Sequence, residues 1–411
     1  MIQQLTKVLS TQLPEAGAAV TSRRQLRALG LMSETYADGG IQRFNRTFLA
    51  ACDRLGIECD VLSLGDCEAA RSRWTAPSLI RAMLFDHNKP RFALATTGRI
   101  VRGGYDLIVV GHINLLVLAI AATKLRRDAR IILIAHGIEV WTGLTGLRRR
   151  ALRAVDSILC VSRYTQQAIQ KQVPELPDDR FIVFPNALSE SWRELPAVSH
   201  FRQTQLPERF LLSVSRLDRG DRYKGIVTVL EALAMIEDES VHYVVAGRGN
   251  DLEFIKRVAE RCNVSKRVHF CGSVPDEELA SLYSRCLAFV LPSGKEGFGI
   301  VFLEAMFFGA CVIAAREKGA VDVVRHEETG LLVPYGDVPA LKQAIDRVIA
   351  DTALRRRMCA AGRATVVGDG AFTFRSYVRR LAGVLNVSAP EVMAAKESAP
   401  DVNASADETC A

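Results

Sequence analysis

The segment LAFVLPSGKEGFGIVFLEAMFFGACVIAA, residues 287–315, shows most clearly how this chain is expected to fold. Two short apolar runs predict strands over 288–291 and 311–314. Between them lie a glycine-containing loop and an apolar segment that predicts a helix over 300–309. Because the strands lack polar alternation and are joined through a helix, they indicate a parallel sheet that helices cover on both faces.

The same alternation of strands and helices extends in both directions from this segment. In the second half, strands are expected at 210–214, 241–246, 268–270, 288–291, 311–314 and 330–333, and helices at 225–236, 252–262, 276–284, 300–309 and 338–350. In the first half, strands are expected at 29–33, 58–63, 106–110, 130–135, 157–161 and 181–184, and helices at 41–55, 115–126, 146–155 and 164–172. Two such series predict an α/β protein with two doubly wound, Rossmann-like domains.

The alternation stops between Pro185 and Pro207, and the domain boundaries follow from this break. We expect a first domain over 1–190, with 1–25 as a flexible or additional segment, then a linker over 191–208 and a second domain over 209–370. A helix over 371–388 is expected to pack back towards the first domain, and the tail over 389–411 is expected to be disordered. Two such domains in tandem bring the carboxyl ends of their strands to a shared cleft, where we expect the ligands.

The composition is that of a soluble, cytoplasmic globular protein. Charged residues make up 24%, and the net charge of +7 fits an anionic small substrate or an anionic membrane surface, whereas no arginine–aromatic cluster indicates nucleic acid. The 10 cysteines show no spacing typical of metal ligands and are expected to be reduced, buried thiols. The N-terminus lacks the apolar core of a signal peptide, and polar residues interrupt the most apolar stretch, 107–123, so no transmembrane segment is predicted.

The loop KEGFG and the helix after it contain the strongest candidate binding residues. Gly297 and Gly299 allow the backbone to approach a ligand, and the start of the helix offers free N–H groups to an anion such as a diphosphate. Glu304 lies within the apolar run IVFLEAMFFGA, where an unpaired carboxylate is costly. We therefore expect Glu296 and Glu304 to accept hydrogen bonds from a sugar and a ribose, against the alternative of two solvated glutamates.

Two further loops at expected strand ends face the same cleft. SRLDRGDRYKG contains Arg216 and Lys224, two cations that suit a diphosphate whose negative charge grows as a glycosidic bond breaks. The alternative is an exposed basic loop. GRGN, with Gly247 and Gly249, could let backbone amides approach a nucleotide, although it lacks the third glycine of a dinucleotide-binding fingerprint.

The first half supplies a second group of candidates. Asp38, Gly39 and Gly40 lie between a strand and a helix and suggest a phosphate or acceptor loop, against a plain tight turn. His136 and Glu139, in AHGIEVW, follow the strand RIILIA and are placed for contact with a substrate. Asn186, in FPNA, ends the last strand of this half and is expected in the cleft or the hinge.

Taken together, these motifs resemble glycosyltransferase family 4, a family of retaining enzymes with the GT-B fold. GGxxR, HGxE, VSRYT, PNA, SR followed by YKG, GxG, EGFGI with its second Glu, and ETGLLVP occur in the family's order over about residues 28 to 385. The resemblance implies an acceptor-binding first domain and a second domain that binds a nucleotide sugar. It implies same-face attack, with the departing diphosphate accepting the acceptor's proton, and no cofactor or divalent metal, because no DxD motif is present.

The resemblance also implies roles for individual residues. Arg216 and Lys224 would bind the donor diphosphate, and Gly39 and Gly40 would approach its phosphate. The sugar would be held by Glu296 and by the amides of Gly297, Phe298 and Gly299, and His136 would contact it. Glu304 would accept hydrogen bonds from the ribose. The residues counted as catalytic are thus His136, Arg216, Lys224 and Glu296. The family's usual PNGVD is PNALS here, which leaves the role of Asn186 open.

The acceptor and the cellular location are less defined by the sequence. Basic residues outnumber acidic ones between 120 and 155, which indicates either a solvated helix face or a peripheral contact with an anionic membrane. Such a contact would suit a lipid-linked oligosaccharide acceptor in exopolysaccharide or lipopolysaccharide synthesis. Donors of mannose, glucose or N-acetylglucosamine fit equally. Alternatives are a non-catalytic GT-B scaffold subunit and a nucleotide-sugar epimerase on the same fold.

Overall fold

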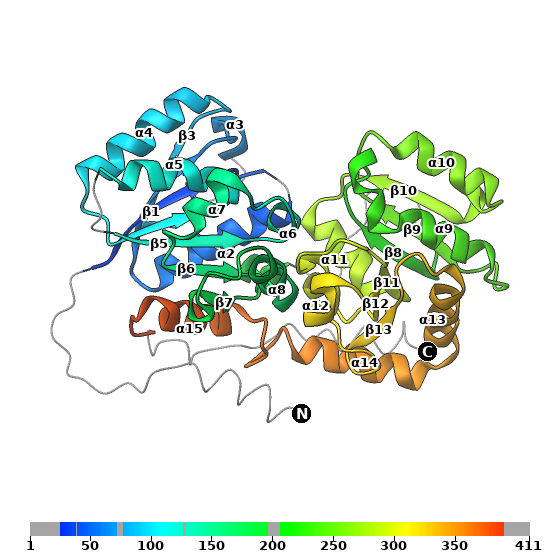
Figure 1. Cartoon of the computed structure of the whole chain (residues 1–411). Coiled ribbons are helices and arrows are strands. Elements are labelled where there is room, and N and C mark those ends of the chain that lie inside the picture. Colours follow the sequence, from blue (N-terminus) through cyan, green and yellow to red (C-terminus); the bar gives the residue numbers. More distant parts are fainter. Residues whose placement is uncertain (1–24, 38, 72–76, 126–128, 196–205, 390–411) are drawn as a thin grey trace.

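The computed structural model describes residues 25–37, 39–71, 77–125, 129–195 and 206–389. Within them the chain forms two parallel sheets, one in each half, and helices cover both sheets (Figure 1). The expected α/β fold with two doubly wound domains is confirmed. The predicted extra segment 1–25, the tail 389–411, the centre of the linker and Asp38 lie outside the described residues, apart from the boundary residues 25 and 389.

The first sheet has the strand order β3-β2-β1-β4-β5-β6-β7. Its strands are β1 (Arg27–Met32), β2 (Glu58–Ser63), β3 (Ile80–Leu84), β4 (Leu107–Val110), β5 (Arg130–Ala135), β6 (Ser157–Cys160) and β7 (Phe181–Val183). The helices of this half are α2 (Gly40–Arg54), α3 (Glu68–Arg71), α4 (Lys89–Arg102), α5 (Ile113–Thr123), α6 (Ile138–Trp141), α7 (Gly146–Leu152) and α8 (Arg163–Gln172). The order of strands reverses between β1 and β4.

The second sheet has the order β10-β9-β8-β11-β12-β13. Its strands are β8 (Phe210–Val214), β9 (His242–Ala246), β10 (Val268–Gly272), β11 (Ala288–Leu291), β12 (Val312–Ala315) and β13 (Gly330–Val333). The helices are α9 (Ile226–Ala234), α10 (Leu252–Arg261), α11 (Asp276–Arg285), α12 (Ile300–Phe307), α13 (Val338–Ala350), α14 (Thr352–Ala364) and α15 (Phe374–Leu385). Here the order reverses between β8 and β11.

The sequence prediction missed one strand, β3, and three helices: the long helix α4 and the four-residue helices α3 and α6. In β3 buried and more exposed residues alternate and its sequence, IRAML, includes an arginine, so it lacks the continuous apolar run of the other strands. The start of α4 did carry a signal, because the side chain of Asn88 caps the helix by accepting from Arg91 N at 3.0 Å and Pro90 follows in the first turn.

The last helix, α15, follows the second domain in sequence but packs against the first domain. It contacts α2, and in Figure 1 it lies beneath the first domain near β7. Tyr377 on α15 is fully buried, with its ring centroid 6.1 Å from that of Phe44 on α2 and 4.7 Å from that of Phe184. One continuous apolar core therefore runs from α2 through α15 and the linker residue Trp192 into the second sheet.

Candidate functional site

The charged candidate residues of the second domain follow β8 and β11, the two strands at which the strand order reverses. In parallel α/β sheets, ligands bind outside the carboxyl ends of the strands at such a point. Arg216 comes two residues after β8, and the loop with Glu296 comes after β11. The fold therefore brings together two segments that are 80 residues apart in numbering.

Lys224 and Glu296 form an ion pair at this position. The Lys224 ammonium donates to Oε1 of Glu296, and the side chains are only 18% and 9% exposed. Lys224 ends a short 3-10 helix, η3 (Arg219–Lys224), and Gly225 follows with φ of 81°. A Cβ on Gly225 would lie 2.6 Å from the carbonyl oxygen of Pro292, so the close approach that brings the pair together requires glycine there.

Arg216 lies beside this pair with an open guanidinium. Its side chain is 68% exposed, and Nη2 donates to Oδ1 of Asp221 at 3.2 Å. Asp221 is buried and also accepts from the Tyr223 hydroxyl at 2.8 Å, so the carboxylate anchors the arginine loop. Burial, followed by the hydrogen bond to Asp221, raises the pKa of Tyr223 and keeps it a neutral donor. The site thus offers one exposed and one largely buried cation.

Gly247 and Gly249, which follow β9, pack against the loop that carries Arg216. A Cβ on Gly247 would collide with the carbonyl oxygen of Ser215, and one on Gly249 would lie 2.5 Å from Asp218 N. These glycines allow the loop after β9 to pack against the loop that carries Arg216. The packing explains their presence without a direct ligand contact.

The loop 297–299 lies against the first domain. A Cβ on Gly297 would collide with the carbonyl oxygen of His136, and one on Gly137 would lie 2.8 Å from Gly297 Cα. Phe298 is buried, with its ring centroid 5.6 Å from that of Phe372. Gly299, with φ of 90°, begins α12. The structure therefore places the backbone of this loop beside His136.

Glu304, on α12, does not lie at the helix surface. Its side chain is 2% exposed, and Oε1 accepts from Arg43 Nη1 at 2.6 Å while Oε2 accepts from the Tyr283 hydroxyl at 3.0 Å. Burial raises the pKa of Glu304, and the largest opposing influence is the charge of Arg43. Arg43 comes from α2 in the first domain, so Glu304 takes part in a contact between the two domains.

The structure also shows residues that the sequence analysis did not name. Besides Glu304, Arg43 contacts Asp276 Oδ1 through Nη2 at 2.8 Å, and its guanidinium lies 4.9 Å from the ring centroid of Trp192. The one available signal was the position of Arg43 in GGxxR, three residues after Gly40. Asp276 and Trp192 carried no signal, since their proximity to Arg43 depends on how the domains pack.

Gly39 and Gly40 precede Arg43 at the start of α2. Gly39 is the N-cap residue with φ of 152°, and no side chain caps the helix. A Cβ on Gly40 would meet no atom within 4 Å, so packing does not require glycine there. At Gly40 a ligand could therefore approach the backbone of α2 closely.

His136 and Glu139 are held by their own domain. The His136 ring is 2.9 Å from the Gly111 carbonyl through Nε2, and a carbonyl can only accept, so Nε2 carries the proton and Nδ1 remains an acceptor. Burial lowers the pKa of His136, which favours the neutral ring. Glu139 accepts from the backbone N–H groups of His136 and Gly137 at 2.6 and 3.1 Å. Its carboxylate thus fixes this turn.

Asn186 is buried near the linker and α15. Its Oδ1 atom has no hydrogen-bond partner among the described residues. The neighbouring carbonyl of Pro185 accepts from Arg380 on α15 at 3.5 Å. This contact joins the segment to α15.

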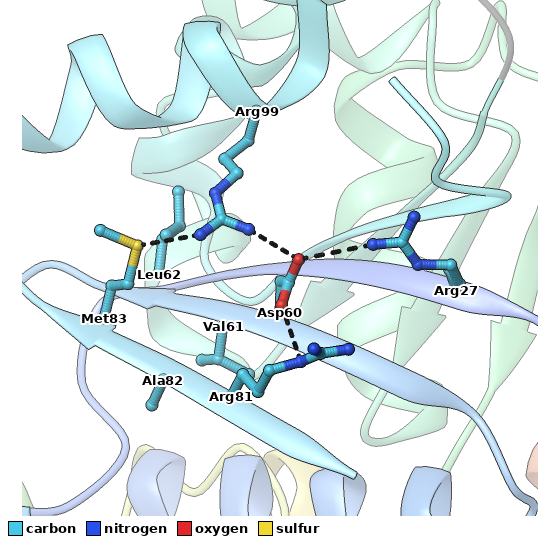
Figure 2. A pocket seen from close by; sticks show the side chains of 8 residues that line it. All are labelled: Arg27, Asp60, Val61, Leu62, Arg81, Ala82, Met83 and Arg99. Carbon is cyan, nitrogen blue, oxygen red and sulfur yellow. Dashed lines mark hydrogen bonds and ion pairs between the residues drawn. The ribbon is translucent and has the colours of Figure 1, made fainter. Parts of the chain in front are cut away.

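A cavity of about 240 Å³ lies elsewhere, between α4 and the strands β1, β2 and β3 (Figure 2). Three arginines, Arg27, Arg81 and Arg99, surround the carboxylate of Asp60, with the shortest contact, 2.8 Å, from Arg99 Nη1. Tyr105 also donates to Asp60 at 2.6 Å. This network ties α4 to the sheet and includes none of the candidate site residues.

Two family descriptions match the chain, one in each half. "Glycosyltransferase Family 4" matches residues 38–191, and "Glycosyl transferases group 1" matches residues 199–365. The chain belongs to glycosyltransferase family 4. The resemblance inferred from the motifs is confirmed, and the protein is a glycosyltransferase of the type that uses nucleotide sugars.

Relatives with similar sequences cover much of this family-4 chain. It is 29% identical over 267 residues to a GDP-mannose-dependent alpha-(1-6)-phosphatidylinositol monomannoside mannosyltransferase of Mycobacterium tuberculosis, covering 60% of this chain and 67% of the relative. It is 32% identical over 156 residues to the lipopolysaccharide core biosynthesis glycosyltransferase LpsE of Rhizobium meliloti, covering 38% of this chain and 45% of the relative.

Solved structures agree on the fold. Anabaena Alr3699/HepE in complex with UDP superposes with a TM-score of 0.71 at 19% identity, covering 88% of this chain and 100% of that one. Sucrose-phosphate synthase from Thermosynechococcus elongatus gives 0.69 at 22% identity, covering 88% and 98%. At these identities the likeness establishes the GT-B fold alone.

Two features are absent from the described residues. None of the described helices has the length and apolar character that crossing a bilayer requires. Among the same residues, no cluster of three or more His, Cys, Asp or Glu side chains is arranged to hold a metal ion.

Proposed function

We propose that this glycosyltransferase moves a hexose from a nucleoside diphosphate sugar to a lipid-linked saccharide, with retention of configuration and without a metal ion. The observation that carries the proposal is the Lys224–Glu296 ion pair beside Arg216, at the strand-order reversal of the second sheet and close to the loop that meets His136. This arrangement joins groups for a diphosphate to a group for sugar hydroxyls.

The two cations would stabilise the leaving diphosphate. Negative charge grows on it as the glycosidic bond breaks, and fixed cations in a partly buried site stabilise that charge better than water does. Lys224 is largely buried and held by Glu296, whereas the exposed Arg216 guanidinium can close on a second phosphate oxygen. The proposal thus assigns to side chains the role that a divalent metal has in other glycosyltransferases.

The remaining groups would position the sugar rather than exchange protons with it. Lys224 occupies one oxygen of Glu296, which leaves acceptor capacity for sugar hydroxyls. Neutral His136 donates through Nε2 to Gly111, and Glu139 is engaged by backbone N–H groups. Because burial lowers the pKa of His136 and makes its free Nδ1 a weak base, we assign the proton of the attacking hydroxyl to the departing diphosphate. This is the same-face attack expected of a retaining enzyme.

The donor is best sought first among GDP-sugars. Relatives from Mycobacterium tuberculosis and Mycolicibacterium smegmatis are named as GDP-mannose-dependent, and WbdA of Escherichia coli is named as a mannosyltransferase. UDP-glucose and UDP-N-acetylglucosamine remain in the panel, because discrimination between bases depends on the shape of the pocket.

The first domain has a face suited to an anionic membrane surface. Leu94, Leu125 and Leu147 are 76%, 68% and 65% exposed, and they lie on or next to α4, α5 and α7, which contact one another in series. Basic residues accompany them; exposed examples are Arg91, Lys124 and Arg150. Apolar side chains between cations suit the interface of an anionic bilayer, so we propose that this face brings the enzyme to a lipid-linked acceptor.

Ligand-induced stabilisation tests the donor proposal. Purified protein is heated in EDTA with GDP, UDP and their mannose, glucose and N-acetylglucosamine derivatives, and one nucleotide is expected to raise the melting temperature in a concentration-dependent way. That donor is then incubated with a lipid-linked acceptor extract, and proton NMR of the product reads the anomeric configuration. Inversion, or a strict need for a metal, would overturn the corresponding part of the proposal.

Vesicle sedimentation tests the membrane face. We expect the protein to bind vesicles with 30% phosphatidylglycerol but not pure phosphatidylcholine. L94S/L147S should weaken binding about tenfold, because it removes two exposed leucines that would enter the bilayer interface. The matched control is M235S, because Met235 is an exposed apolar residue of the second domain, 47% accessible. Equal binding by wild type and L94S/L147S would leave this face as a solvated surface.

A further inference from the structure

Arg43 joins the two domains through the carboxylate that is expected to bind the ribose. It stands in the first turn of α2, and its guanidinium spans Glu304 on α12 and Asp276 at the start of α11, at 2.6 and 2.8 Å. Trp192, in the short helix η2 (Glu190–Glu194) of the linker, lies under the guanidinium. One side chain thus contacts the linker and two helices of the second domain.

The contact covers Glu304 completely. The Glu304 side chain is 2% exposed, with one oxygen facing Arg43 and the other the Tyr283 hydroxyl. A carboxylate has about four acceptor positions, so Arg43 and Tyr283 leave capacity for two further hydroxyls, but with the domains in contact those positions are inaccessible. A ribose can therefore reach Glu304 only if Arg43 moves.

Asp276 gives Arg43 an alternative partner during such a movement. The Asp276 side chain is 48% exposed, whereas that of Glu304 is almost inaccessible. If Arg43 releases Glu304, it can keep its ion pair with Asp276 and its contact with Trp192, so the cation is never left unpaired. Burial lowers the pKa of Arg43, but Glu304 and Asp276 raise it by more, so the guanidinium stays charged throughout.

We propose that Arg43 is a positioning residue for the donor, which covers Glu304 when the domains meet without nucleotide and yields it to the ribose hydroxyls when the donor binds. The inference rests on the proposed function, since it takes a nucleoside diphosphate sugar as the donor. Arg43 thereby makes donor binding depend on the relative position of the domains. The wild type binds nucleotide less tightly than it would without this contact, because part of the population has Glu304 occupied.

The decisive experiment compares ribonucleotides with their 2′,3′-dideoxy analogues. Isothermal titration calorimetry measures GDP, UDP, ddGDP and ddUDP binding to wild type and R43Q. Whichever ribonucleotide binds the wild type should bind R43Q about tenfold more tightly. This factor is expected if about one wild-type molecule in ten has Glu304 free for the ribose and nearly all R43Q molecules do. The dideoxy analogue, which lacks the hydroxyls that would replace Arg43 at Glu304, should bind both proteins equally.

A matched control separates this effect from a general loosening of the domains. Asp322 in η5 (Lys318–Asp322) also pairs across the domains, accepting from the backbone N–H and Nε of Arg163 at 2.6 and 2.7 Å. D322N weakens that contact without touching Glu304. We expect it to change ribonucleotide and dideoxynucleotide affinity by the same factor. If R43Q behaves like D322N, Arg43 acts only through domain contact and the proposal is overturned.

Further variants keep the result interpretable. R43K retains the charge but has a single donor group, so its gain in ribonucleotide affinity should be smaller than that of R43Q. It serves as the second variant if R43Q folds poorly. In the E304Q background, R43Q should give no gain in ribonucleotide affinity, because the group that Arg43 covers is altered. A gain that persists in E304Q contradicts the proposal. If the wild type binds no nucleotide at millimolar concentration, the proposed function itself fails, whereas unchanged affinity in R43Q and R43K overturns only the role of Arg43.

Discussion

In the second domain, the candidate residues Lys224 and Glu296 contact one another, whereas His136 and Glu139 of the first domain contact their own backbone. Lys224 pairs with Glu296, and Arg216 is anchored by Asp221 next to them. In the first domain, Glu139 accepts from two backbone N–H groups and His136 is bound to the Gly111 carbonyl. The second domain has therefore assembled charged groups for a ligand, and the first contributes fixed turns and the open backbone near Gly40.

Under the proposed function, this difference would divide specificity between the two domains. A diphosphate needs fixed charges, and the proposal assigns them to the partly buried strand ends of the second sheet. The proposal assigns the acceptor to the first domain, whose loops and exposed helices can change composition easily. The following predictions test this contrast, beginning with the largest expected effect.

Loss of Lys224 should have the largest effect. K224A removes the buried cation and leaves Glu296 without its partner, and we expect sugar transfer to fall by about 10³-fold, as for other losses of a fixed group that stabilises developing charge. The neighbouring Lys295 is exposed, so K295A is the matched control and should change the rate by less than about threefold. Initial rates of nucleoside diphosphate release, with the donor found by thermal shift, provide the measurement. Similar rates for K224A and wild type would remove the central support for the diphosphate site.

Two glycines, one in each domain, should respond differently to the same change. G297A places a methyl group against the carbonyl of His136, so it should separate the loop from the first domain and lower kcat by about 10²-fold. G40A meets no atom within 4 Å and should fold normally.

A comparison of kcat and KM separates the two glycines. We expect G40A to raise the donor KM without altering the melting temperature, because a methyl group hinders only an approaching phosphate. A G297A enzyme with unchanged kcat would mean that contact between loop and His136 is irrelevant to transfer. An unchanged KM in G40A would leave Gly40 as a plain turn residue.

The pH dependence of stability should show the smallest effect. Burial raises the pKa of Glu304 above its ordinary 4.5, so the folded chain binds this proton more tightly and stability falls as pH rises from 4.5 through the folded pKa. R43Q removes the main lowering influence, raises that pKa further and should steepen the fall. Relative to wild type, we expect R43Q to lose about 2 °C in melting temperature between about pH 5 and pH 7.

Calorimetric scans across that range provide the measurement, and the double variant R43Q/E304Q is the control. It has no titrating carboxyl at position 304 and should not show the steeper fall. Parallel pH profiles for R43Q and wild type would show that Arg43 does not hold the charge of Glu304.

Most of the fold could be predicted from local pattern, and the exceptions have local reasons. Strands such as 210–214 and 288–291 match the structure because continuous apolar runs between turn residues specify a strand that is buried on both faces. The strand β3 was missed because one side of it is partly exposed and its residues are mixed. The start of α5 was placed two residues late, because His112 caps the helix by accepting from Asn114 N at 3.1 Å.

The amino-acid sequence was sufficient to predict the two-domain α/β fold, the family and the motifs at the carboxyl ends of the second sheet's strands. Short-range pattern sufficed for these, since a loop after an apolar strand must emerge at the strand's carboxyl end. The group that faces Glu304, in contrast, depends on how the two domains pack. Arg43 and Glu304 are 261 residues apart, and their contact exists because two separately folded sheets pack through the linker at Trp192. A buried charge selects its partner by position in space, which no local pattern records.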